Sequence, residues 1–194
     1  MIKLLDKTNI EDFKSLLSNI DTIMGQDLSE FIPWAGKTRR EILVDKMIHD
    51  WLLWDSKSRN AFGWFADGKL RTVLCQDFSV TVKAWSMSYY FSDYKDYRAI
   101  HTGTACGEYA MAEAERIGYY EYYRVIEASK IKVFDRAWRD SIRKRYIMVV
   151  DEIVPALEKP ITTHSWDWLF EMNTKTIDSA IVKGILLPEY RKVN

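Results

Sequence analysis

Five small residues in the middle of the chain are of the types found in loops that bind phosphate at a helix N-terminus, although they match no stringent phosphate-loop pattern. They lie between a strand-like segment, TVKAWSMSYYF, and a helix-like segment, EYAMAEAERIG. A loop of small residues at a helix N-terminus presents free backbone N–H groups and the positive end of the helix dipole. The pattern therefore predicts a site for the phosphate or pyrophosphate of a nucleotide-like cofactor. Its residues are Gly103, Thr104, Ala105, Cys106 and Gly107.

Other interpretations of the same segment stay open. Small residues at the start of a helix also allow close packing against a neighbouring element, without any ligand. Cys106 near a helix N-terminus is a candidate thiolate nucleophile with His101 as its base, although a small buried packing residue is the favoured interpretation. His49 and His164 lie far apart in the sequence, and no His/Cys cluster has zinc-ligand spacing, so we expect no metal site.

The periodicity of the chain predicts the elements that position these residues. Thr38 and Glu41 form a capping box for a long helix, Asp67-Gly68 is a hairpin turn, and Gly118 ends the helix that follows the small residues. The helix that Gly118 ends is expected over 104–117, and further helices are expected after an N-cap at Thr8, over 28–31 and over 131–142. Strands are expected over 2–5, 60–65, 70–78, 80–91, 119–126, 146–154 and 180–187.

This order of elements predicts the fold class. It is typical of a mixed α/β (α+β) protein with a mostly antiparallel central sheet flanked by helices. Neither a repeat nor a flexible linker interrupts the sequence, so we expect a single domain over residues 1–194.

Composition limits the classes of function. Lys plus Arg total 28 and Asp plus Glu total 28, so overall charge gives no reason to expect nucleic-acid or membrane binding. The N-terminus MIKLLDKTNIEDF is interrupted by charge too early for a secretory signal, and no apolar run has the length of a membrane span. Cys75 and Cys106 have no paired spacing, so we expect reduced buried thiols in a cytoplasmic protein.

The element order and the Gly103-Thr104-Ala105 sequence resemble the GNAT (GCN5-related N-acetyltransferase) superfamily. The acyl-CoA loop of that family reads Gln or Arg, two residues, Gly, one residue, then Gly or Ala. Ile100 stands where Gln or Arg is expected, and Arg98 lies two residues too early. The terminal segments RYIMVVDEIVPALE and AIVKGILLPEY look like the last strand pair of the family. The sequence and its order of elements are also similar to those of divergent GNAT-like proteins of tailed bacteriophages.

The resemblance implies an activity. It implies acetyl-CoA as cosubstrate, held near Gly103 to Gly107, and transfer of the acetyl group to a primary amine of a small molecule or protein. The tyrosine that the family commonly uses to protonate the thiolate is missing from KIKVFDRAWRDSIRK, and Tyr146 lies beyond that helix. No catalytic residue is therefore assigned. The alternative is a catalytically inactive GNAT-fold protein that acts as a binding or virion-associated module, in the host cytoplasm if a phage encodes it.

Two further segments are candidate interaction surfaces. Trp166, Trp168 and Phe170 in HSWDWLFEM suggest docking of a protein partner or a second copy of the chain.

Glu152 and Glu171 are carboxylates that could act as a general base, but their spacing does not select either one. A basic cluster could meet the phosphates of a cofactor, an RNA or an acidic protein partner, with a solvated helix face as the favoured interpretation. It comprises Lys130, Lys132, Arg136, Arg139, Arg143, Lys144 and Arg145.

Overall fold

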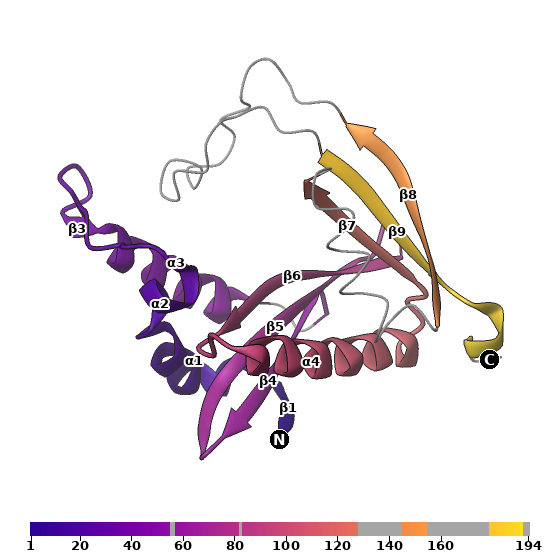
Figure 1. Cartoon of the computed structure of the whole chain (residues 1–194), viewed down its shortest axis with the longest axis horizontal. Helices are drawn as coiled ribbons and strands as arrows, with labels where there is room; N and C mark the ends of the chain where they lie inside the picture. The colour runs from indigo at the N-terminus through magenta and orange to yellow at the C-terminus, as the bar shows by residue number, and fades with distance from the viewer. Residues whose placement is uncertain (55–56, 82, 128–144, 155–178, 192–194) are drawn as a thin grey trace. The chain divides into compact units, whose positions relative to one another are not determined.

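The computed structural model describes residues 1–54, 57–81, 83–127, 145–154 and 179–191 (Figure 1). The chain divides into two compact units, Met1–Tyr119 and Tyr120–Asn194, which are described in turn. The predicted fold class is confirmed, because strands pair in antiparallel fashion in both units and helices flank the sheet. The expectation of a single domain stays a prediction. Within the described ranges, no helix combines the length and the apolar character needed to cross a bilayer.

Four antiparallel strands form the sheet of the first unit, in the order β1-β4-β5-β6. The turn between β4 and β5 confirms the predicted hairpin, since Asp67 and Gly68 both have positive φ angles, 52° and 72°. The strands are β1 (Ile2–Leu5), β4 (Arg59–Ala66), β5 (Lys69–Ser79) and β6 (Ala84–Ser92).

The predicted start of β6 at Val80 is wrong. Val80 is 72% exposed and belongs to the turn after β5, and Lys83 has a positive φ of 47°. The early start was predicted because valines alternate with other residues in this part of the sequence. Further along β6, the register with β5 shifts so that Cys75 pairs with Tyr89 and Gln76 with Met87, which leaves residue 88 as a bulge.

The helices of the first unit begin mostly where side chains cap them. The capping box at Thr38 is confirmed: the Thr38 Oγ1 accepts the N–H of Glu41 (3.2 Å), and the Glu41 carboxylate accepts the N–H of Thr38 (2.7 Å). This box starts α3 (Arg39–Leu53). The other helices are η1 (Lys7–Asn9), α1 (Ile10–Leu17), α2 (Ile20–Met24) and α4 (Tyr97–Arg116).

Two helix predictions near the N-terminus are wrong. Thr8 is not an N-cap, because Asp6 accepts the Thr8 N–H (2.7 Å) and caps a 3-10 turn ahead of α1. Residues 28–31 are not helical, since β2 (Phe31–Ile32) pairs with β3 (Lys37–Thr38) in a short hairpin. The sequence signal for these short elements is weak, because Pro33 and Gly36 mark a turn but do not say what it connects.

The sheet of the first unit has one face against α4 and the other against α1. Alternation along β5 decides which side chain goes where. Leu74 joins Phe62, Cys106 and Ala110 in a buried cluster on the α4 side. Cys75, the next residue, lines a cavity with Phe13 of α1 and Trp51 of α3. Both faces of the sheet are therefore covered, and the end of β6 leads directly into the connection before α4.

The second unit contains an antiparallel sheet of three strands in the order β7-β9-β8. Among the side chains of this unit that the structure describes, Tyr122, Tyr146 and Leu186 are fully buried. The bounds of β8 agree with the prediction, and β9 begins one residue earlier than expected. The elements are β7 (Glu121–Glu127), β8 (Tyr146–Val154), β9 (Ser179–Leu186) and a 3-10 turn, η3 (Pro188–Tyr190). The predicted helix at 131–142 and the segment HSWDWLFEM lie outside the described residues.

Candidate functional site

The five predicted cofactor residues lie inside a helix and not in a loop. Helix α4 begins at Tyr97, so Gly103 to Gly107 occupy its second and third turns. The prediction of a Gly-rich loop ahead of the helix is therefore wrong. The cause is Asp96, whose carboxylate accepts the N–H of Arg98 (2.9 Å) and caps the helix before the glycines are reached. Asp96 followed by the helix formers Arg98 and Ala99 was the available sequence signal.

The helical setting removes the physical basis of the predicted phosphate site. Backbone N–H groups inside an α-helix donate to the carbonyl four residues earlier, so they are not available to a ligand. The space above Gly103 is also filled, because a Cβ there would lie 2.8 Å from Cε2 of Tyr90. A Cβ on Gly107 would lie 3.4 Å from Cε of Met87. Residues 103–107 thus do not fit a pyrophosphate in the way that the sequence suggested.

The small residues of α4 instead let the helix pack closely on the sheet. Thr102, Cys106, Ala110 and Ala114 recur at helical spacing and are all buried. Gln76 of β5, which is fully buried, donates from Nε2 to the carbonyl of Ala110 (2.6 Å). The packing interpretation of the small residues is the one that these contacts support.

Cys106 has the environment of a packing residue and not of a nucleophile. Its side chain is 0% exposed, and burial raises the pKa of the thiol to about 12. A catalytic thiolate needs a lowered pKa and access to substrate. The exposed His101 lies edge-on to the ring of Trp64, with a centroid distance of 5.8 Å. The Cys/His nucleophile considered from the sequence is therefore not supported.

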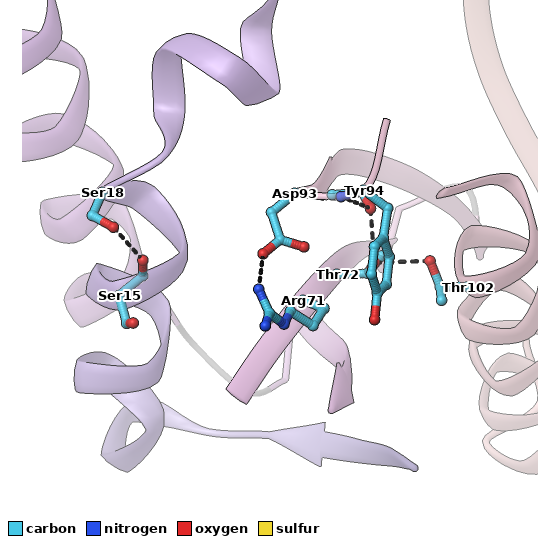
Figure 2. A network of polar contacts seen from close by, with 8 residues as sticks. Ser15, Ser18, Arg71, Thr72, Asp93, Tyr94 and Thr102 are labelled. Atoms are coloured by element: carbon cyan, nitrogen blue, oxygen red, sulfur yellow. Dashed lines mark hydrogen bonds and ion pairs between the residues drawn. The ribbon is translucent and has the colours of Figure 1, made fainter. Parts of the chain in front are cut away.

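A buried polar network fixes the end of β6 to the start of α4 (Figure 2). Thr72 of β5 is fully buried and shares hydrogen bonds with Ser92 of β6 (3.0 Å) and Thr102 of α4 (2.8 Å). The Ser92 hydroxyl also accepts the backbone N–H of Tyr94 (3.2 Å). Sequence reasoning missed these residues, since isolated Ser and Thr in strands and helices give no signal of pairing.

An ion pair holds the same connection from its other side. Arg71 donates from Nη1 to the Asp93 carboxylate (2.6 Å), and the Asp93 N–H donates to the Arg71 carbonyl (3.0 Å). The Asp93 side chain is only 8% exposed. This hydrogen bond raises the pKa of the Arg71 guanidinium above its ordinary value. Asp93 is thereby committed to an intramolecular partner (Figure 2).

The connection between β6 and α4 comprises Asp93, Tyr94, Lys95 and Asp96 and contains no glycine. The Arg98 Nε donates to both oxygens of the Asp96 carboxylate, Oδ1 at 2.9 Å and Oδ2 at 3.0 Å. This hydrogen bond lowers the pKa of Asp96. The Arg98 guanidinium lies over the Tyr94 ring, 4.6 Å from its centroid. The charged groups at the start of α4 are therefore bonded to one another within the protein.

A second candidate region lies at the C-terminal end of α3. An open hollow of about 510 Å³ is bounded by Asp50, Trp54 and Asp77, among other residues. Both carboxylates already have cationic partners: Lys46 lies 3.0 Å from Asp50, and the Arg59 Nε lies 2.5 Å from Asp77. The hollow is thus large and partly lined by aromatic side chains, but both of its carboxylates are paired with cations.

The remaining sequence candidates belong to the second unit. Tyr146 is 2% exposed, and the guanidinium of Arg145 lies over the ring of Tyr190 at 5.1 Å. The side chain of Glu152, Glu171, and the basic cluster from Lys130 to Lys144 all lie outside what the structure describes. Their predicted roles stay predictions.

Comparison with known proteins identifies the fold. No protein-family model and no curated protein matches the sequence. The structure is similar to the aminoglycoside 6'-N-acetyltransferase from Enterococcus faecium, with a TM-score of 0.60 and 10% identity over 97% of this chain and 98% of that one.

Two further solved structures agree with this comparison. The ribosomal-protein-S18-alanine N-acetyltransferase from Escherichia coli gives a TM-score of 0.54 and 13% identity over 96% and 94% of the two chains. A ribosomal L7/L12 alpha-N-protein acetyltransferase in complex with coenzyme A gives a TM-score of 0.58 and 13% identity over 95% of this chain and 93% of that one. The chain therefore has the fold of the GNAT N-acetyltransferases.

Proposed function

We propose that the protein is an acyl-CoA-dependent N-acetyltransferase that moves an acetyl group from acetyl-CoA to a primary amine. The observation that carries the proposal is the likeness of the fold, along more than nine-tenths of the chain, to N-acetyltransferases, one of them in complex with coenzyme A. A chain with this fold has a scaffold similar to the one on which those enzymes work. Fold alone does not carry chemistry, so the site must be tested directly.

The acceptor that we propose is an amine on a small molecule or a protein. The similar structures include a spermidine N-acetyltransferase from Vibrio cholerae, an aminoglycoside acetyltransferase and enzymes that act on ribosomal proteins. An amine is the common feature of these acceptors. We propose a cytoplasmic location, which is the host cytoplasm if a phage carries the gene. We also propose assembly with a protein partner or with further copies of the chain.

The contact between acetyl-CoA and Gly103, Thr104, Ala105, Cys106 and Gly107 stays a prediction. It would have to be made by side chains or by the surface of α4, because the backbone N–H groups of these residues lie within the helix. We assign no catalytic base or acid, and no step of the reaction is derived from these residues.

Two contacts favour a second candidate function, a GNAT-fold binding protein without catalysis. The Tyr90 ring fills the space above Gly103, and the Asp96 carboxylate caps the first turn of α4. Both are contacts within the protein, made by groups at the start of α4 that are then not available to a ligand. A binding or virion-associated module needs the scaffold but not the cofactor, and such a protein would tolerate these contacts.

Calorimetric titration with acetyl-CoA separates the two functions. The enzyme proposal expects a saturable heat with a Kd below about 1 mM, equivalent to about −4 kcal/mol. ATP serves as the control ligand, because it carries phosphates but lacks the acyl-pantetheine arm. Absence of binding at millimolar acetyl-CoA would overturn the enzyme proposal in favour of the binding module. Where acetyl-CoA binds, release of the CoA thiol with a panel of amines tests transfer.

A further inference from the structure

The first turn of α4 already holds an anion, the carboxylate of Asp96. One oxygen, Oδ1, accepts the backbone N–H of Arg98 (2.9 Å) and its Nε (2.9 Å). The other oxygen, Oδ2, lies 2.8 Å from Nη2 of Arg98. A backbone N–H at a helix N-terminus together with a guanidinium is the set of donors that binds phosphate oxygens. In this chain, the same donors are engaged by a side chain of the protein.

The neighbouring surface of the turn is filled by Tyr90 of β6. Its hydroxyl donates to the carbonyl of Ala99, and its ring lies against Gly103. A glycine at a phosphate-binding turn is useful because it lets the backbone approach the ligand closely. Here the group that lies against Gly103 is the ring of Tyr90, so the glycine allows β6 and α4 to pack closely.

The two carboxylates at the connection also repel a phosphate, and the cations that face them are already paired. Asp93 is paired with Arg71 and Asp96 with Arg98, which leaves the positive charge of Lys95. Asp93 is held by Arg71 at 2.6 Å, so its carboxylate cannot turn away without losing that bond. A pyrophosphate brings at least two further negative charges, and each like-charge pair at about 4 Å costs about 1 kcal/mol even in water.

We propose that Asp96 acts as a resident anion that keeps phosphate groups away from the first turn of α4. Any acyl-CoA that this chain uses is then held without a pyrophosphate contact to that turn, and its affinity comes from the rest of the ligand. Only the choice of acetyl-CoA as a ligand rests on the proposed function. The exclusion of phosphate by Asp96 is a property of the turn itself.

The test follows the amide signals of Tyr97, Arg98 and Ala99 in the ¹⁵N-labelled full chain. Inorganic pyrophosphate and acetyl-CoA are titrated at low salt into the wild type and into Asp96→Ser and Asp96→Asn. Both replacements keep a residue that caps a helix, so α4 is expected to stay folded, as far-UV circular dichroism will show. The matched control is Asp27→Ser, which removes an exposed aspartate that accepts the Ser29 N–H (2.9 Å) away from any helix start.

In the wild type and in Asp27→Ser, we expect no saturable shift of these three amides with either ligand. In Asp96→Ser and Asp96→Asn, we expect pyrophosphate affinity at these amides to rise by about fivefold or more, because one like-charge pair at about 4 Å is removed. Saturable shifts at Tyr97 to Ala99 in the wild type would overturn the proposal. Equal behaviour of the Asp96 variants and the wild type would overturn the role of Asp96.

The outcome for the proposed function is separate. If acetyl-CoA binds the wild type and shifts other amides only, both proposals are supported. If acetyl-CoA binds nowhere while the Asp96 variants gain pyrophosphate affinity, the acetyltransferase proposal fails and the exclusion by Asp96 stands.

Discussion

The ring of Tyr90 occupies the position that a side chain on Gly103 would need. A Cβ built on Gly103 lies 2.8 Å from Tyr90 Cε2 and 2.9 Å from both Cζ and the hydroxyl oxygen. The hydroxyl also donates to the carbonyl of Ala99, one turn earlier in α4. One aromatic residue of β6 thus determines which residue α4 can carry at this point of contact.

This relationship predicts a measurable coupling between the two positions. In a helix interior, Gly→Ala stabilises by about 1 kcal/mol through helix propensity alone. In the wild type, Gly103→Ala should lose that gain, because the Tyr90 ring must move and overpacking costs about 1–3 kcal/mol. In a Tyr90→Ala background, the same change should recover it. Urea unfolding of the four proteins gives the coupling energy, and additive effects would contradict the contact.

The buried hydroxyl of Thr72 predicts a second stability effect. Thr72→Val keeps the shape but removes the bonds to Ser92 and Thr102, and it should cost about 1–3 kcal/mol of unfolding free energy. Thr104→Val, in the partly buried surface of α4, is the matched control and should cost less. Chemical denaturation measures both. A Thr72→Val protein as stable as the Thr104→Val protein would show that the network contributes nothing.

Much of the fold was predictable because local signals and tertiary structure agree. The Thr38 capping box, the Asp67-Gly68 turn and the positive φ of Gly118 (85°) each depend on short-range chemistry that the sequence displays. Strand β8, Tyr146–Val154, has the predicted bounds because a run of mostly β-branched and apolar residues, interrupted by Asp151 and Glu152, ends at Pro155.

The site was predicted less well because its geometry depends on long-range contacts. The start of α4 depends on one capping aspartate, and Asp93 and Asp96 are indistinguishable as N-caps in the sequence. Asp93 is instead taken by Arg71, twenty-two residues earlier in the chain. Glycine likewise marks close approach without saying what approaches, and at Gly103 the neighbour is Tyr90 and not a ligand.

The two aspartates of the connection should respond differently to neutralisation. Asp93→Asn weakens the charge-assisted bond to Arg71 at a side chain that is 8% exposed, and it should cost about 1.5–3 kcal/mol. Asp96→Asn keeps a capping residue at an exposed position and should cost clearly less. Thermal unfolding at neutral pH compares the two. Equal losses would contradict the assignment of Asp93 as the buried anchor.

The pKa of Asp96 gives the pH dependence of its cap. Arg98 lowers this pKa below the ordinary value of an aspartate, so the native state favours the charged form. The stabilisation is therefore present above the unfolded pKa and is lost as pH falls through the folded pKa. Stability of the wild type should decline below about pH 4 more steeply than that of Asp96→Asn. Parallel curves of unfolding free energy against pH would contradict the contact.

The two cysteines should be unreactive in the native protein and destabilising at high pH. Burial raises the pKa of both Cys75 and Cys106 to about 12, so neither forms a thiolate near pH 8. A thiol-specific reagent should label two groups per chain in denaturant and neither in the native state. Since the folded pKa exceeds the unfolded value, stability should be complete below about pH 9 and should fall as pH rises towards 12. Rapid native labelling of Cys106, detected by peptide mass mapping, would contradict its burial and would restore the nucleophile hypothesis.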